Sequence, residues 1–211
     1  MRIKRNIKLF LYRLKDQKIY YMIPLFYIFS VAGLAWFSFY HHKRYFPRDE
    51  IYKLLNVFAP FFSLFWVLPI VCERTDEKWG EFFISCRTDS VWRVIIHNII
   101  FDLIMLPAFC LFSGVYGNML NIYLQMAVTC VFVQCIGITA LYLSSSAFSA
   151  YGIPFLYFCL TMFSLLDSEM NSALSYVPYE EMSMQEYAAV YCWKMIAVFL
   201  MTFYSVIRTR M

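Results

Sequence analysis

Long apolar runs constrain this chain more than any other feature of its sequence. A bilayer with a hydrocarbon core of ~30 Å is crossed by an α-helix of about 20 mostly apolar residues. One of the runs is short for a bilayer and begins beside Pro154. The sequence therefore predicts an all-α, polytopic membrane protein with six transmembrane helices. The six expected spans are Ile19–Tyr40, Leu54–Cys72, Val94–Tyr116, Ile122–Ser145, Ile153–Leu166 and Ala188–Ile207.

The composition excludes the other broad classes of protein. Of the 211 residues, 62% are hydrophobic and 15% are charged, whereas soluble domains contain about 25% charged and about 45–50% apolar residues. A mean hydropathy of +0.59 excludes disordered, collagen-like and ordinary soluble chains. The apolar run after the basic start is too long for a cleavable signal peptide and lacks a small-residue cleavage site.

Basic residues gather on one side of the expected spans. Four lie on the other side, and the last loop on that side has no Lys or Arg. The positive-inside rule then predicts that both termini face the cytoplasm. We expect the plasma membrane as the location of the protein. The basic residues on the expected inner side are Arg2, Lys4, Arg5, Lys8, Arg13, Lys15, Lys18, Arg74, Lys78, Arg87, Arg93, Arg208 and Arg210.

Residues 1–18 form a separate segment ahead of the transmembrane domain, 19–211. Five apolar residues of this segment fall on one helical face, and most of the basic residues fall elsewhere. Such a helix lies in the headgroup layer of a membrane. We expect an interfacial amphipathic helix, which acts either as a topology signal or as an elbow that helps to grip a cytoplasmic partner. The apolar residues are Ile3, Ile7, Phe10, Leu11 and Leu14.

The expected cytoplasmic loop at 73–93 has the most specific pattern in the chain. Five acidic residues are interleaved with aromatic residues at spacings of i, i+3 and i+4. A short helix with aromatic and acidic faces suits a groove on a partner protein, although a solvated loop would show the same spacing. Residues 88–90 then offer N-caps for the next helix. The acids are Glu73, Asp76, Glu77, Glu81 and Asp89, and the aromatic residues are Trp79, Phe82 and Phe83.

This loop resembles the corresponding loop in the membrane subunit of type-two ATP-binding-cassette (ABC) exporters. The family region reads approximately Glu-Arg-Glu-x-Gly-Thr-x-Glu, then a Leu-Leu-Ser step and a Pro-x-Ser-Arg step. Glu73 and Arg74 match its opening pair, Glu81 the later acid, and residues 83–85 the Leu-Leu-Ser step, with Arg93 near the final Arg. The chain departs from the pattern in lacking the Gly-Thr pair, and it has His97 and Asn98 where a Lys is common.

The resemblance implies a permease subunit whose loop contains a coupling helix seated in a cleft of a separate ATPase subunit. It also implies a broken external segment, here 167–187, and a second permease copy or a related permease subunit. The chain has no G-x-x-x-x-G-K-[ST] motif for nucleotide phosphates, so ATP and Mg are expected on the partner. The coupling residues implied are Glu73, Arg74, Glu77, Trp79, Glu81, Phe82 and Phe83.

The cargo is inferred only by analogy with the fold. A short permease with a hydrophobic interior and small loops suits export of a peptide, an antimicrobial or another amphipathic substrate. The expected protein is therefore a transport subunit and no enzyme, with the bilayer as a further partner and no nucleic acid.

Three ionisable residues fall inside the expected spans. A charge near the bilayer centre costs ~2.5–3.5 kcal/mol on insertion scales, so each one needs a physical reason. His97 lies nearer the cytoplasmic edge, Asp102 about two turns into the third span, and Lys194 inside the sixth. Asp102 and Lys194 either line a substrate path or form an ion pair, and Lys194 can instead snorkel outward.

Two other functions fit part of the sequence. A six-span substrate-binding subunit of a vitamin-type importer has a similar size, although the charged loop at 73–93 is unexpected there. An intramembrane enzyme needs an H-E-x-x-H or G-x-S-x-G element, and the sequence has neither. The seven Cys form no C-x-x-C pair, and His41 and His42 have no evident metal-binding partners. The sequence therefore predicts no catalytic residue and no metal site.

Overall fold

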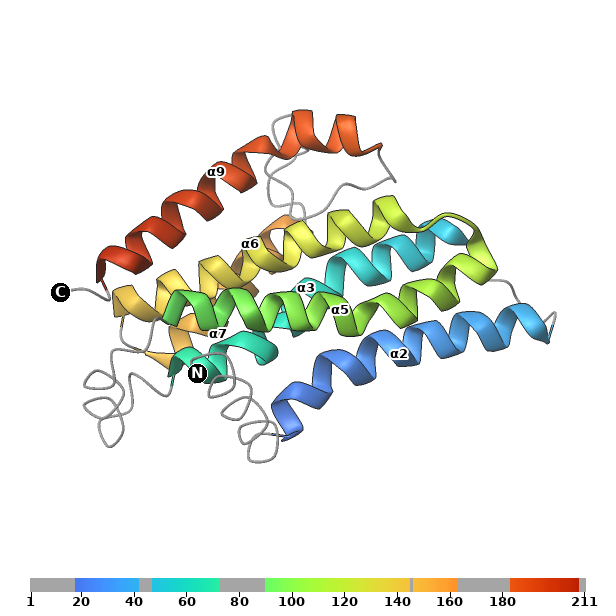
Figure 1. The fold of residues 1–211 in the computed structure, drawn as a ribbon, viewed down its shortest axis with the longest axis horizontal. Helices are drawn as coiled ribbons and strands as arrows, with labels where there is room; N and C mark the ends of the chain where they lie inside the picture. The colour runs from blue at the N-terminus through green and yellow to red at the C-terminus, as the bar shows by residue number, and fades with distance from the viewer. Residues whose placement is uncertain (1–17, 42–46, 73–89, 145, 163–182, 209–211) are drawn as a thin grey trace, which may run out of the picture.

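The computed structural model describes residues 18–41, 47–72, 90–144, 146–162 and 183–208. Within these ranges every secondary-structure element is an α-helix, which confirms the predicted all-α class (Figure 1). The helices are α2 (Lys18–Tyr40), α3 (Arg48–Cys72), α5 (Ser90–Tyr116), α6 (Leu120–Ser144), α7 (Ala147–Met162) and α9 (Met184–Arg208).

Successive helices reverse direction, so their ends collect at two opposite ends of the bundle. The end of α3, the start of α5, the end of α6 and the end of α9 lie at the left in Figure 1. The end of α2, the start of α3 and the turn between α5 and α6 lie at the right. Both helix ends that flank residues 73–89 therefore lie at the same end as the end of α9.

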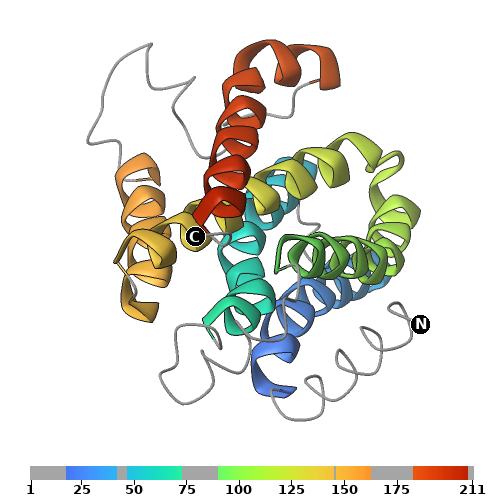
Figure 2. The same cartoon turned by 60° about the vertical axis from the view of Figure 1, so that its left-hand side comes forward.

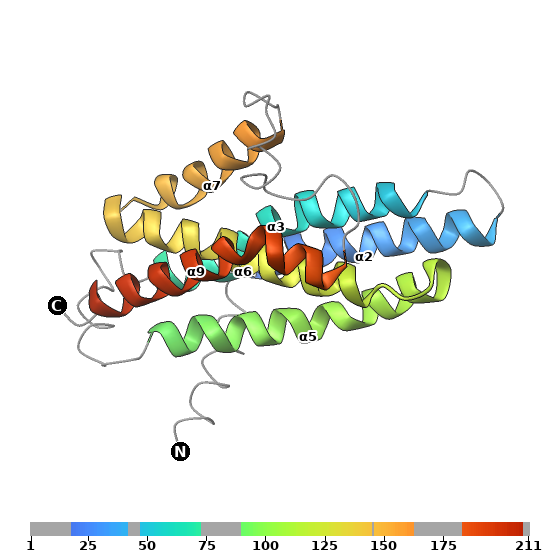
Figure 3. The same cartoon turned by 90° about the horizontal axis from the view of Figure 1, so that it is seen from above.

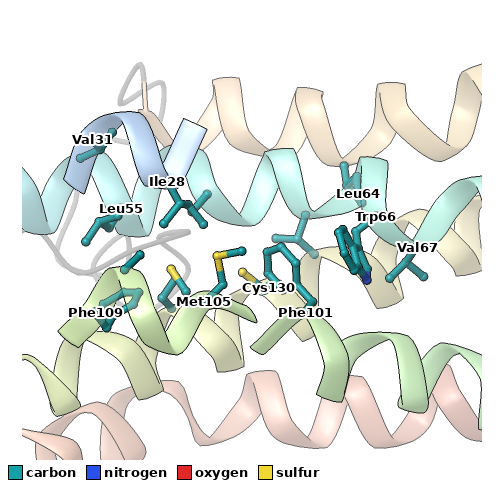
Figure 4. Packing of buried hydrophobic residues seen from close by; sticks show 14 of the residues in the cluster. Ile28, Val31, Leu55, Leu64, Trp66, Val67, Phe101, Met105, Phe109 and Cys130 are labelled. Carbon is teal, nitrogen blue, oxygen red and sulfur yellow. The ribbon is translucent and has the colours of Figure 1, made fainter. Parts of the chain in front are cut away.

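Helices α3 and α6 form the centre of the bundle. Helix α6 packs against α3, α7 and α9, and α2 packs against α3 and α5. Figure 2 shows α7 on one side of this centre and α2 and α5 on the other. The apolar side chains between α2, α3, α5 and α6 point toward one another in Figure 4 and form one continuous core. They include Ile28, Val31, Leu55, Leu64, Trp66, Val67, Phe101, Met105, Phe109 and Cys130.

Large hydrophobic side chains cover much of the outer surface as well. Phe26 on α2 is 72% exposed, Phe148 on α7 is 86% exposed and Phe199 on α9 is 70% exposed, and many other large hydrophobic residues lie beside them. Soluble proteins rarely expose such extensive apolar surface. Five of the described helices are long and apolar enough to cross a bilayer. This architecture fits a multi-pass membrane protein.

The predicted fifth span differs from the structure. We expected Ile153–Leu166, but α7 begins six residues earlier and is described as far as Met162. As a helix of 16 residues it is shorter than the five long spans. The prediction treated Pro154 as a helix start, whereas Pro154 lies inside α7. Transmembrane helices tolerate an internal proline when neighbouring groups accommodate the released backbone carbonyl.

The carbonyl released by Pro154 lies at a tight contact between α6 and α7. Pro154 has no N–H to donate to the carbonyl of Ala150 four residues earlier. A Cβ atom added at Gly137 of α6 would lie 2.9 Å from the Ala150 carbonyl oxygen and 3.1 Å from Leu64 Cδ2 of α3. The missing side chain therefore lets α6 approach both neighbours, as small residues do between membrane helices.

Helices α3 and α9 begin earlier than predicted, and a side-chain cap stabilises the first turn of α9. The Ser183 N–H donates to Glu186 Oε2 at 3.0 Å, and the Glu186 N–H donates to Ser183 Oγ at 3.3 Å. This reciprocal pair is a capping box, and it places residues 184–187 of the expected external loop inside α9. Helix α3 extends upstream of Leu54 through its polar first turns to Arg48.

The turn between α5 and α6 is closed by a side chain from α3. Gly117 has a φ of 81°, the left-handed conformation that ends many helices, and Asn118 Oδ1 accepts from the Leu120 N–H at 2.9 Å. The Arg48 guanidinium donates to the carbonyls of Tyr116 at 3.0 Å and Asn118 at 2.9 Å. A cation at the C-terminal end of α5 also complements the helix dipole.

The contact at Gly137 predicts that Gly137→Ala destabilises the protein. The added methyl group must displace backbone on α7 or a core leucine on α3, and such overpacking costs about 1–3 kcal/mol. Thermal unfolding of the purified protein in detergent, followed by size-exclusion chromatography, measures the effect. Gly114→Ala is the matched control, because an added Cβ there meets nothing within 4 Å. Equal unfolding temperatures for the two variants would contradict the tight α6–α7 contact.

Candidate functional site

The residues that we expect to contact an ATPase lie outside the described residues. These are Glu73, Arg74, Glu77, Trp79, Glu81, Phe82 and Phe83. Residues 1–17, most of the expected external loop and His42 also lie outside the described residues. The coupling role therefore stays a prediction. Three candidate residues, His97, Asp102 and Lys194, lie within the described helices.

His97 lies in the core near the start of α5. Its side chain is buried, and its carbonyl accepts a hydrogen bond from Trp66 Nε1 of α3 at 3.0 Å. The Trp66 ring packs edge-on against Tyr21 with centroids 4.9 Å apart and lies 5.5 Å from Phe101. These contacts join α2, α3 and α5 close to the helix ends that flank residues 73–89. His97 thus belongs to a packed junction of three helices.

Asp102 lies one turn further along α5 and is only partly buried. Its carbonyl accepts a hydrogen bond from the Tyr123 hydroxyl of α6 at 3.0 Å. Within the described helices, no ion pair joins Asp102 to Lys194, so the two charges do not form the structural pair considered from the sequence. The two residues belong to different sites.

Lys194 is fully buried between α6 and α9 and is surrounded by aromatic rings. Its Nζ lies 4.0 Å from the ring centroid of Tyr191, 5.8 Å from those of Phe132 and Tyr187, and 6.0 Å from that of Trp193. We call these four rings and Lys194 the lysine box. A desolvated ammonium over aromatic faces gains about 2 kcal/mol or more from cation–π attraction, which offsets part of the cost of its burial.

The lysine box is held together by contacts that also connect α6, α7 and α9. Phe132 packs edge-on against Trp193, with centroids 5.2 Å apart, and against Tyr157 of α7 at 6.0 Å. Tyr187 lies 4.8 Å from Tyr191. Because Tyr191 and Tyr187 precede Lys194 on α9, the lysine stem extends toward the start of that helix. It follows the direction expected for snorkelling without reaching the surface.

A row of buried polar groups continues from the lysine box to α3. The Tyr187 hydroxyl lies 3.0 Å from Thr129 Oγ1, and Thr129 Oγ1 donates to the Gln125 carbonyl at 2.9 Å. Tyr52 donates to Gln125 Oε1 at 3.3 Å, and Asn56 Nδ2 donates to the Tyr52 carbonyl at 3.3 Å. This row crosses the bundle from α9 to α3.

This polar row was not predicted from the sequence, although the sequence contains a signal for it. Gln125 and Thr129 are four residues apart on α6, and Tyr187, Tyr191 and Lys194 recur at helical spacing on α9. Polar residues in register inside apolar spans indicate a buried face. What the sequence does not provide is the pairing of α6 with α9, because both helices are apolar around most of their circumference.

The arrangement of the described polar groups suits positioning and binding. In the described ranges no three His, Cys, Asp or Glu side chains come together as a metal-binding group. The buried polar groups lie on several helices and are surrounded by apolar and aromatic side chains. The site can therefore hold helices together or accommodate a polar group of an otherwise apolar molecule.

The lysine box predicts strong energetic coupling between Tyr191 and Lys194. In a double-mutant cycle with Tyr191→Leu and Lys194→Met, we expect a coupling of about 2 kcal/mol, because the ammonium loses its nearest ring. Asp102→Asn with Lys194→Met is the control pair and should be additive within about 0.5 kcal/mol. Unfolding of the purified protein by titration with a denaturing detergent gives both values. If Asp102 and Lys194 were coupled and Tyr191 and Lys194 were not, the assignment of Tyr191 as the partner of Lys194 would be wrong.

In comparisons of the chain with protein-family models, with curated proteins and with solved structures, nothing matched.

Proposed function

We propose that this chain is the permease subunit of an ABC exporter in the plasma membrane, driven by a separate ATPase subunit. In this proposal two permeases, either two copies or a copy and a related subunit, form the pathway. The cargo is a peptide, an antimicrobial or another amphipathic molecule. The observation that supports the proposal best is the position of the helix ends that flank residues 73–89.

The end of α3 and the start of α5 lie at the same end of the bundle as the end of α9 (Figure 1). This end is also where the positive-inside rule puts most of the basic residues, among them Arg93 in the first turn of α5 and Arg208 at the end of α9. The opposite end has Arg48 and Lys53 at the start of α3. A cytoplasmic acidic and aromatic loop between α3 and α5 is consistent with both features.

Helices α3 and α5 are well suited to carry mechanical work away from such a loop. Trp66 of α3 is hydrogen-bonded to the α5 backbone at His97 and packs on Phe101, so the two helices are joined directly behind the loop. A displacement of the loop would therefore move α3 and α5 together. Helix α3 also contacts α6, through which the movement would reach the lysine box on α9.

The proposed orientation predicts that Trp79→Cys, in a variant without the seven native Cys, is labelled from the cytoplasmic side. A membrane-impermeant maleimide should react with it only after the cells are permeabilised. Asn121→Cys is the control, because Asn121 is exposed in the first turn of α6 at the opposite end of the bundle. That variant should be labelled in intact cells. Labelling of Trp79→Cys in intact cells would contradict the proposed topology.

The proposed coupling predicts that the tagged chain, purified from its native membrane, retains an Mg-dependent ATPase. Glu73→Ala combined with Phe82→Ala should lower the retained ATP hydrolysis at least tenfold, because it removes an acidic and an aromatic contact of the loop. Asn121→Ala, at the other end of the bundle, should retain the wild-type level. Equal ATP hydrolysis in all three preparations, or none in any of them, would argue against an ABC permease.

A further inference from the structure

Helix α2 lies at the edge of the bundle and packs through one of its sides. Figure 3 shows it running between α3 and α5, Figure 1 shows it below both, and it packs against these two helices. The opposite face of α2 is exposed along the length of the helix. The buried side chains recur at helical spacing, and they are Tyr21, Ile28, Val31, Ala32, Ala35 and Ser38.

The middle of the exposed face of α2 consists of large apolar side chains. No Asp, Glu, Lys, Arg or His lies between Ile19 and Tyr40. Contacts between membrane helices favour small residues and side chains that form hydrogen bonds, whereas Gly33 is the one small residue among the exposed residues described on α2. This composition suits contact with lipid chains better than contact with another helix. The large exposed residues are Met22, Phe26, Phe29, Leu34 and Phe37.

Amphipathic aromatic residues bound this apolar stretch at both ends. Tyr20, near the start of α2, is 46% exposed, and Tyr40, at its end, is 68% exposed. The exposed Trp36 ring stacks on Tyr40 with centroids 5.3 Å apart, and the ring of the exposed His41 lies 4.3 Å from that of Phe37. Tyr and Trp are enriched at the two interfaces between a membrane and water. The exposed face therefore has a rim of interfacial residues at each end.

The separation of the two rims matches the thickness of a bilayer. Tyr20 and Tyr40 are 20 residues apart, which corresponds to ~30 Å along a helix. The hydrocarbon core of a bilayer is also ~30 Å thick. Polar groups of other helices lie at the same end of the bundle as Tyr40, including Arg48 of α3 and Asn118 in the α5–α6 turn (Figure 1).

We propose that the exposed face of α2 is a lipid-contacting surface that crosses the whole hydrocarbon layer. Tyr20 lies in one phospholipid headgroup layer, Trp36 and Tyr40 lie in the other, and Phe29 lies near the bilayer centre. The inference goes beyond the proposed function, because it assigns the occupant of a surface and does not require an ATPase. In an assembly of two permeases, the second one would pack on a face other than this one.

Nitroxide labels test where this face lies in the bilayer. In the full-length chain without native Cys, Tyr20→Cys, Phe29→Cys and Tyr40→Cys are labelled and studied in phospholipid nanodiscs. Power saturation compares access by oxygen, which dissolves in the hydrocarbon layer, with access by a nickel chelate, which stays in water. We expect an oxygen-to-chelate ratio about fivefold or more higher at residue 29 than at residues 20 and 40, because the bilayer core holds no water.

Ile28→Cys is the matched control for depth. Ile28 lies next to Phe29 but is fully buried against the bundle, so oxygen and the chelate should both reach its label poorly. Equal oxygen-to-chelate ratios at residues 20, 29 and 40 would overturn the proposal, whether or not the control variant folds.

Photocross-linking in the native membrane identifies what covers this face. Benzoylphenylalanine in place of Phe29 should form phospholipid adducts after irradiation, detected by mass spectrometry of the purified tagged chain. The same replacement at Phe101, which is 1% exposed in the core, should form none. A product that joins residue 29 to a second copy or to another protein, or the absence of a phospholipid adduct there, would overturn the proposal.

The outcome is independent of the ATPase experiment. Lipid contact at α2 without any retained ATPase would keep the surface and remove the exporter function. Retained ATPase with a second chain cross-linked at residue 29 would keep the exporter function and remove the lipid surface.

Discussion

The absence of water inside a bilayer is the constraint on which the rest of this structure depends. Every backbone polar group in the spans must be satisfied within the chain, so the described segments are helices. The same constraint acts on side chains and explains the Lys194 environment. Lys194 is fully buried, and its Nζ lies 4.0 Å from the centroid of the Tyr191 ring and within 6.0 Å of three further rings, contacts that favour a desolvated ammonium group. The helix pair α6–α9 is organised around that requirement.

Helix α6 meets each neighbour through a different kind of contact. Gly137 allows close backbone approach to α7, Phe132 and Thr129 hold α9 through its aromatic residues, and Gln134 donates to the backbone of α3. Because these contacts differ in chemistry, each side of α6 selects a particular helix as its neighbour and sets the position of that helix. The hydrophobic effect cannot do this inside a membrane, where lipid tails are as apolar as the helices.

The sequence predicted the all-α class and the approximate position of all six described helices. Its errors came from polar and proline residues at helix boundaries. The sequence predicts a helix start at Pro154, whereas Pro154 lies inside α7, and the Ala150 carbonyl, to which Pro154 cannot donate, lies beside Gly137. The Ser183–Glu186 capping box extends α9 upstream. The Asp102–Lys194 ion pair, one of the alternatives that the sequence leaves open, is not formed within the described residues, because Lys194 faces α6 while Asp102 lies beside Tyr123. The loop at 73–89 remains a prediction from its residues.

The sequence by itself determined that the chain must be helical and membrane-embedded, because hydropathy and span length depend only on local composition. It also determined which residues carry charge inside the spans. Only the tertiary structure decided what surrounds those charges. An apolar helix offers many equivalent faces, so pairing between distant helices depends on a few side chains such as Gly137 and Lys194. Gly137 meets Ala150, which is 13 residues away in the sequence, and Lys194 meets Phe132, which is more than 60 residues away.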